Sequence, residues 1–415
     1  MRPVQVGSGQ VRVGPVWAGQ IGMMAGLLGL LLGLPQVMQA QTTPESSPLI
    51  DPATVLEPID CLLSAAAASP GERLGYDQDF GADRQALLRA IDHSLSYLAT
   101  EKAMADYAEI ALPGFSRDRV RRSLGRFRQL VTQSHSAAEL QTAVATEFAF
   151  YRSVGNDGEG TVAFTGYFEP TYAASRDRTD EYRYPLYAEP ADLETWAEPH
   201  PTRAELEGAD GLQSHNGPLQ GLELVWLRDR LEAFLVQVQG SARLQMTDGS
   251  IVSVGYAGRT NYEYTSIGRA LINDGIVAED ELSLPVLLEY FRDNPTALDN
   301  YLPRNNRFVF FKQTNGGPPT GNLSVPVTTG RSIATDKSIM PPGALGLIAL
   351  EMPTRDAAGE WGAVPISRYV LDQDTGGAIR GPGRVDIFVG TGTEAGEQAG
   401  LINTVGELYY LLLRD

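Results

Sequence analysis

The sequence predicts an α+β protein that is mainly β, with helices before about residue 152 and two β-rich portions after them. Apolar residues repeat at helical spacing from Gly81 to Arg152. From Gly160 onward, short apolar runs alternate with turn residues, and glycine-rich loops dominate the last part of the chain. A chain of 415 residues with 43% hydrophobic residues is long enough for two or three domains.

Three helices are predicted in the first portion, and Ser116 is a candidate cap for the second. Their apolar positions are Leu87, Ile91 and Leu95; Val120, Leu124 and Phe127; and Leu140, Val144 and Phe148.

The middle portion reads as strands with two short helices. Thr161–Pro170 is a strand that ends in a polar and aromatic turn, and Asp248-Gly249 is a hairpin turn that leads into Ile251–Val254. Further strands are expected at Leu222–Trp226, Phe234–Gln239, Phe308–Phe311, Val325–Thr328 and Leu345–Leu350, and helices at Thr265–Ile272 and Leu282–Asn294.

The composition is acidic, with 33 basic and 51 acidic residues and a net charge of −18. Nucleic-acid binding needs a concentrated positive field, so we expect no nucleic-acid partner. The four histidines are scattered without metal-ligand spacing. We therefore expect no metal site, no cofactor and no histidine-based catalytic triad.

The N-terminus has the pattern of a targeting segment. Arg2 and Arg12 precede an uncharged run, Ile21–Leu34, and Ala40 ends a stretch that resembles a cleavage site. We expect residues 1–40 to be a signal peptide, with a retained anchor as the alternative. Residues 41–58, rich in Thr, Pro and Ser, are expected to be a flexible tether.

Three aspartates border turns and strands near the C-terminus. Asp374 and Asp386 flank a loop in which Gly376 and Gly377 leave the backbone open, and Asp336 precedes a Pro-Pro-Gly turn. Each aspartate taken alone fits a turn-stabilising role. Asp374 and Asp386 together also fit the paired carboxyl groups of glycoside cleavage, in which a carboxylic acid protonates the leaving oxygen.

Ordered motifs from about Thr165 to Gly406 resemble the membrane-bound lytic transglycosylase A family with its C-terminal three-aspartate domain. The motifs are Gly166–Pro170, Val238–Ser241, Asp248–Ser250, Gly255–Gly258, Ser266–Gly268, Asn305–Phe311, Gly330–Gly343, Asp374–Gly381, Val385–Gly390 and Thr393–Gly400.

The resemblance implies a double-psi β-barrel with a second, smaller β-domain inserted into it and a glycan groove between them. The expected boundaries are 59–172 for the helical part and first barrel strands, 173–314 for the inserted β-domain, and 315–415 for the segment that completes the barrel.

The resemblance also implies an enzyme that cleaves the β-1,4 bond between N-acetylmuramic acid and N-acetylglucosamine in peptidoglycan and leaves a 1,6-anhydro end. Asp386 matches the family's catalytic acid and base, and Asp336 and Asp374 match its supporting aspartates. We expect a raised pKa for Asp386, because Ile387 and Phe388 make its setting apolar.

Six further residues are candidates for contact with the glycan. Tyr167, Glu169, Gln239 and Ser241 are expected in the groove, and Gly376 and Gly377 would let a sugar approach the backbone. The alternative for Tyr167 and Glu169 is that they only fix a turn.

The expected partners are peptidoglycan glycan strands, and the chain is expected to be a monomer in the periplasm. No cysteine stands where a lipid would be attached, since Cys61 lies well past the apolar run, so lipid anchoring is not expected and outer-membrane association is the alternative. The competing functions are a hydrolase that uses Asp374 with Asp386 and a non-catalytic glycan-binding module.

Overall fold

The computed structural model describes residues 51–59, 74–110, 112–279, 281–282, 284–314 and 316–414. The expected signal peptide and the first part of the expected tether lie outside these residues. The end of the tether is corrected, because Leu56–Ile59 forms strand β1 and pairs with β2 (Phe148–Ser153). Val55 is fully buried in the main core, and this burial holds the segment against the sheet.

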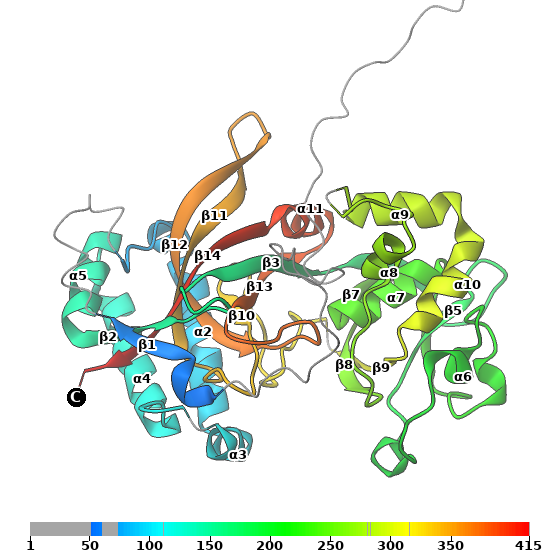
Figure 1. Ribbon diagram of the computed structural model, residues 1–415, viewed down its shortest axis with the longest axis horizontal. Helices are drawn as coiled ribbons and strands as arrows, with labels where there is room; N and C mark the ends of the chain where they lie inside the picture. Colours follow the sequence, from blue (N-terminus) through cyan, green and yellow to red (C-terminus); the bar gives the residue numbers. More distant parts are fainter. Residues whose placement is uncertain are drawn as a thin grey trace, which may run out of the picture.

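The first sheet has eight strands, six of which close into a barrel (Figure 1). Its other strands are β3 (Val162–Glu169), β10 (Ser332–Ala334), β11 (Leu345–Arg355), β12 (Trp361–Asp374), β13 (Arg384–Thr391) and β14 (Asn403–Leu413). The strand order is β1-β2-β14-β11-β12-β10-β13-β3, and β14 also pairs with β3. That last pairing closes the ring, so the expected barrel is confirmed.

Four helices pack around one end of the barrel: α2 (Phe80–Leu98), α3 (Glu101–Glu109), α4 (Arg117–Gln133) and α5 (Ala137–Glu147). Ser116 caps α4 by accepting from the Arg119 N–H, as predicted. The helix predicted from Leu140, Val144 and Phe148 is α5. It is shorter than expected, because Phe148 has extended backbone angles and begins β2.

A buried ion pair ties the helical part to the barrel. Arg331 is completely buried. Its Nη1 donates a hydrogen bond to Oδ2 of Asp77 at 2.5 Å, and its guanidinium also pairs with Asp83. Two negative charges around one guanidinium satisfy a cation that would otherwise be costly to bury.

The second sheet is open and has the order β5-β6-β4-β7-β8-β9. Its strands are β4 (Thr171–Ser175), β5 (Tyr184–Tyr187), β6 (Glu223–Leu227), β7 (Ser241–Met246), β8 (Ile251–Arg259) and β9 (Val309–Thr314). The predicted hairpin is present between β7 and β8, where Gly249 has φ +83°. This inserted part follows β3 after the single residue Pro170.

The inserted part contains more helix than the two short helices that the sequence predicted. Five helices accompany its sheet: α6 (Arg203–Glu207), α7 (Arg230–Gln239), α8 (Ile267–Asn273), α9 (Leu284–Asp293) and α10 (Leu298–Tyr301). The predicted helices at Thr265–Ile272 and Leu282–Asn294 correspond to α8 and α9.

Two predicted strands are wrong. Phe234–Gln239 lies in α7, which begins where Asp229 accepts from the Leu231 and Glu232 N–H groups and ends at Gly240 in the left-handed region. Val325–Thr328 forms no strand and has only an isolated bridge from Pro326 to Thr320, because a proline nitrogen cannot donate to a ladder.

The described residues contain no helix long and apolar enough to cross a membrane.

Candidate active site

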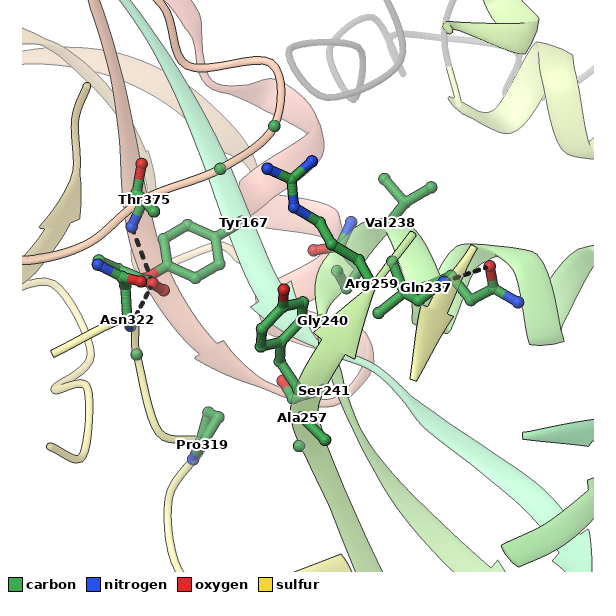
Figure 2. A pocket seen from close by; sticks show the side chains of 18 of the residues that line it. Tyr167, Gln237, Val238, Gly240, Ser241, Ala257, Arg259, Pro319, Asn322 and Thr375 are labelled. Atoms are coloured by element: carbon green, nitrogen blue, oxygen red, sulfur yellow. Dashed lines mark hydrogen bonds between the residues drawn. The ribbon is translucent and has the colours of Figure 1, made fainter. Parts of the chain in front are cut away.

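A cavity of about 500 Å³ lies between the barrel and the inserted part. Figure 2 shows Tyr167 and Thr375 on its barrel side, with Gly240, Ser241 and Arg259 facing them from the inserted part. The loop that returns from the inserted part supplies Pro319 and Asn322 to a further wall.

The strand β10 brings the three aspartates together. It pairs with β12 on one side, where Ala334 is opposite Asp374, and with β13 on the other, where Ala334 is opposite Asp386. Asp336 follows two residues after Ala334. One short central strand therefore places all three carboxyl groups at one end of the barrel.

Asp374 lies at the cavity wall and accepts three hydrogen bonds. The Tyr167 hydroxyl donates to Oδ2 at 2.8 Å, and the N–H groups of Asn322 and Thr375 each donate to Oδ1 at 2.9 Å. Burial raises the pKa of Asp374, and these three donors oppose that rise. The donors thus stabilise the charged form of this half-buried carboxyl group.

Asp386 is buried in β13, with 2% of its surface exposed. Its Oδ1 has no hydrogen-bond partner among the described residues, and the Arg384 guanidinium lies 3.4 Å away. Burial raises the pKa of Asp386 to about 6, with a further rise from Asp374 and an opposing effect of Arg384. The predicted direction of this pKa shift therefore agrees with the structure, and burial is its main cause.

Asp386 does not line the cavity, whereas Tyr167 and Asp374 do. It shares a strand face with Phe388, whose ring packs 5.2 Å from the Tyr167 ring. Tyr167 in turn bonds Asp374 at the wall. The two carboxyl groups thus occupy different depths of one site.

Asp336 fixes the glycine-rich loop that connects β12 to β13. Its Oδ2 accepts from the Gly381 N–H at 2.9 Å, and its Oδ1 accepts from the Ser338 hydroxyl at 2.6 Å. With these bonds, Asp336 holds the loop that forms part of the cavity wall.

The candidate groove residues divide into two groups. Five of them line the cavity, namely Tyr167, Gln239, Ser241, Gly376 and Gly377. Glu169 does not: its Oε2 accepts from the Thr391 hydroxyl at 2.8 Å, it lies 3.7 Å from Arg243, and 1% of its surface is exposed. These contacts of Glu169 are compatible with the alternative that it only fixes a turn, and its contact with the glycan stays a prediction.

At Gly377 the backbone of the barrel loop lies close to the Arg307 side chain of the inserted part, which leaves no room for a Cβ atom. A Cβ atom there would overlap Nη1 of Arg307, which comes from the inserted part just before β9. The sequence motif Asn305–Phe311 contained Arg307, but nothing in it showed that this side chain reaches the glycine loop. Asn322, which donates to Asp374 through its backbone, lies outside all the sequence motifs, and the motif Asp374–Gly381 did not show that the Thr375 N–H bonds Asp374.

Within the described residues, no group of three or more His, Cys, Asp and Glu side chains is placed to hold a metal ion.

Comparisons with known proteins agree with this architecture. Residues 163–312 match the MltA specific insert domain, and residues 331–412 match the 3D domain. Membrane-bound lytic murein transglycosylase A of Vibrio cholerae is 34% identical over 265 residues, which cover 63% of this chain and 68% of that protein. The Escherichia coli K12 protein of the same name is 33% identical over 260 residues, which cover 62% of this chain and 67% of that protein.

Solved structures show the same fold. A membrane-bound lytic murein transglycosylase from Agrobacterium tumefaciens has a TM-score of 0.65 and 27% identity over 81% of this chain and 95% of its own. Escherichia coli MltA with bound chitohexaose has a TM-score of 0.65 and 25% identity over 88% of this chain and 96% of its own. The chain belongs to the MltA family of lytic murein transglycosylases, with both the MltA specific insert domain and the C-terminal 3D domain.

Proposed function

We propose that this protein cleaves peptidoglycan glycan strands as a lytic transglycosylase, with Asp386 as the single acid and base. The observation that carries the proposal is a buried carboxyl group with a pKa of about 6 and an oxygen without a hydrogen-bond donor, beside a cavity between two domains. Family membership and the glycan bound to the Escherichia coli relative support the same substrate.

In the first step, protonated Asp386 donates its proton to the glycosidic oxygen between N-acetylmuramic acid and N-acetylglucosamine. The bond from that oxygen to the muramic C1 breaks, and positive charge develops at C1. Burial favours this chemistry because it keeps the proton on Asp386 at a pH at which an exposed aspartate is ionised.

In the second step, the C6 hydroxyl of the same muramic residue attacks C1 and gives its proton to Asp386. The new C1–O6 bond closes the 1,6-anhydro ring, and no water is consumed. An intramolecular nucleophile has a high effective concentration, so a second carboxylate is not required to activate it.

Asp374 supports these steps as the charged partner. Three donors stabilise the anion of Asp374, so Asp386 is the carboxyl group that keeps its proton. The negative charge of Asp374 then stabilises the positive charge that develops at C1. Tyr167 and Asp374 line the cavity and Asp386 is 2% exposed, so proton transfer from Asp386 requires the groups around it to move when the glycan binds. Asp336 has a positioning role through Gly381.

A second candidate is hydrolysis by Asp374 and Asp386 as a carboxyl pair. The observation that favours it is that Asp374 and Asp386 both lie opposite Ala334 of β10, and that the charge of Asp374 contributes to the raised pKa of Asp386. The products separate these candidates, because hydrolysis leaves a reducing end and transglycosylation leaves an anhydro end that is lighter by one water.

The test is mass spectrometry of the fragments released from purified peptidoglycan by the full chain and by two variants. The parent protein should release anhydro ends, Asp386→Asn should release almost none, and the exposed turn variant Asp356→Asn should match the parent. Reducing ends in place of anhydro ends would establish hydrolysis, and undiminished cleavage by Asp386→Asn would remove Asp386 from the mechanism.

The curated relatives are named as membrane-bound. We propose that this chain acts in the periplasm after export by the segment 1–40. Recovery in the spheroplast rather than the periplasmic fraction of the native host would contradict this location.

A further inference from the structure

The cavity is basic although the chain is acidic. Among the residues that the structure describes, its lining contains one carboxylate, Asp374, and five cationic side chains: Arg203, Arg259, Arg307, Lys312 and Arg380. The whole chain has a net charge of −18. A groove that only held uncharged sugars would not need this concentration of positive charge, which favours an anionic ligand.

One of these cations is already used by the fold. Arg203 is 1% exposed and donates to the carbonyl oxygens of Asn305 and Arg307 at 2.9 and 2.6 Å, and to the Gln237 side chain at 2.6 Å. It shapes the cavity floor and is not available to a ligand.

Arg307 is a buried arginine of this cavity with an unused donor. It is 7% exposed, its Nε donates to the Tyr262 carbonyl at 2.8 Å, and its Nη2 has no hydrogen-bond partner among the described residues. Burial, together with the charges of Arg259 and Arg380, lowers the pKa of Arg307 to about 10. A buried guanidinium that has an unpaired N–H donor and other positive charges nearby favours binding of an anion, because the anion would pair the donor and reduce the repulsion between the positive charges.

Glu263 shows where such an anion would lie. Its carboxylate is 3.5 Å from Nη2 of Arg307 and 3.5 Å from Nη2 of Arg380, which are longer distances than a charge-assisted hydrogen bond. Its side chain is 78% exposed, so water screens the pairing and the side chain is free to leave. The barrel loop supplies Arg380, and the inserted part supplies Glu263 and Arg307, so the position spans the groove.

The neighbourhood also suits a sugar. Tyr256 lines the same cavity with 44% of its surface exposed, and Arg259 lies close enough to affect its hydroxyl. Figure 2 shows the Arg259 side chain extended into the space between Tyr167 and Val238. An anion bound here would therefore be carried by a glycan in the groove.

We propose that Arg259, Arg307 and Arg380 form a subsite for a carboxylate carried by the glycan strand, and that Glu263 occupies this subsite until the strand displaces it. The inference rests on the proposed function for the identity of the strand. A peptidoglycan strand offers two sources of the carboxylate: the lactyl ether of muramic acid where no peptide is attached, and the stem peptide where one is.

The test measures binding by calorimetry, with Asp386→Asn as the background so that no ligand is cleaved. Three ligands are compared: neutral chitohexaose, a peptide-free fragment with lactyl carboxylates, and the same fragment with stem peptides. The quantity that decides is the ratio of affinity for each anionic fragment to affinity for chitohexaose.

Adding Arg259→Ala or Arg380→Ala should lower this ratio about ten-fold, because each removes a charge from a carboxylate pairing. Adding Glu263→Gln should raise it about three-fold, since the internal competitor is lost. Arg228→Ala, an exposed arginine of the inserted part that pairs with Glu181 outside the cavity, is the control and should leave the ratio unchanged. Arg307 is left intact because it is buried in the fold.

A drop confined to the peptide-free fragment supports the subsite with the lactyl group as its ligand, and a drop confined to the peptide-bearing fragment supports it with the stem peptide. A ratio that stays the same in both arginine variants, or that falls in Glu263→Gln, overturns the subsite. The product analysis of the parent protein is independent of these ratios, so a failure of the proposed reaction is distinguishable from a failure of the subsite.

Discussion

The two walls of the cavity differ in the charge they carry and in how that charge is held. The barrel wall holds two carboxyl groups, the half-buried Asp374 and the buried Asp386, and loss of contact with water raises the pKa of both. The inserted wall holds Arg259, Arg307 and the exposed ring of Tyr256, and Arg380 faces them from the barrel loop. A closed barrel excludes water from a proton donor, whereas an open sheet with helices presents side chains along a groove. The difference indicates that reaction and recognition are assigned to different parts of the chain.

The largest effect is expected at the barrel wall, for Asp386→Asn. Loss of the acid should lower the rate of peptidoglycan cleavage about 1000-fold, within the usual contribution of a general acid. Affinity for glycan, measured separately, should change little if reaction and recognition are separate. A comparable loss of affinity would contradict the assignment of reaction and recognition to different walls of the cavity.

The same variant should change how stability depends on pH. The folded chain keeps the Asp386 proton up to about pH 6, whereas an unfolded aspartate loses it near pH 4. Between these values the folded state binds more protons, so the free energy of unfolding falls as pH rises. Asp386→Asn removes that loss and should be more stable than the parent by about 2 kcal/mol at about pH 8. Denaturant titration at about pH 4 and about pH 8 measures this difference in the free energy of unfolding. The cleavage activity of the parent should decline above about pH 6, because Asp386 then loses its proton.

An intermediate effect is expected for Tyr167→Phe, which keeps the ring beside Phe388 and removes the donor to Asp374. A hydrogen bond to a charged group contributes about 1.5 kcal/mol, so cleavage should slow about ten-fold. The pKa of Asp374 should rise when this donor is lost, and the pH profile of kcat should move with it. An unchanged pH profile would indicate that Tyr167 only packs against its neighbours.

The smallest effect is expected where the two walls touch, for Gly377→Ala. The added methyl group meets Arg307, and overpacking costs about 1 kcal/mol, which corresponds to a rise in KM of about five-fold. Gly362→Ala in β12 is the matched control, since a Cβ there meets nothing within 4 Å. A change in kcat with KM unaffected would place Gly377 with the reaction rather than with recognition.

Much of this arrangement was visible in the sequence, and the remainder depends on long-range contacts. Helix spacing and the Ser116 cap predicted α4, and Asp248-Gly249 predicted the β7–β8 hairpin, because these signals are local. The segment Phe234–Gln239 was misread because its apolar content fits a buried strand or helix equally well. The caps at Asp229 and Gly240 were the signal that separates the two.

The candidate site was predictable in its residues and not in its geometry. Motif resemblance identified the three aspartates, but β10 is three residues long and no periodicity reveals it. The depth of Asp386, the donors to Asp374 and the reach of Arg307 depend on pairings between segments that are far apart in the chain. The contacts of Glu169 could not be predicted for the same reason, since its partners Thr391 and Arg243 come from distant strands.

The closure of the barrel by β14 has a consequence for how the chain acquires its structure. The strand β3 ends at Glu169, but its partners β13 and β14 begin at Arg384 and Asn403, after the whole inserted part has been synthesised. Contacts of such wide sequence separation form slowly. The inserted sheet, contiguous in the chain, is therefore expected to fold first and hold the ends of its own segment close together. By shortening the loop that the barrel must close, it acts as an internal scaffold for the part that carries the acid.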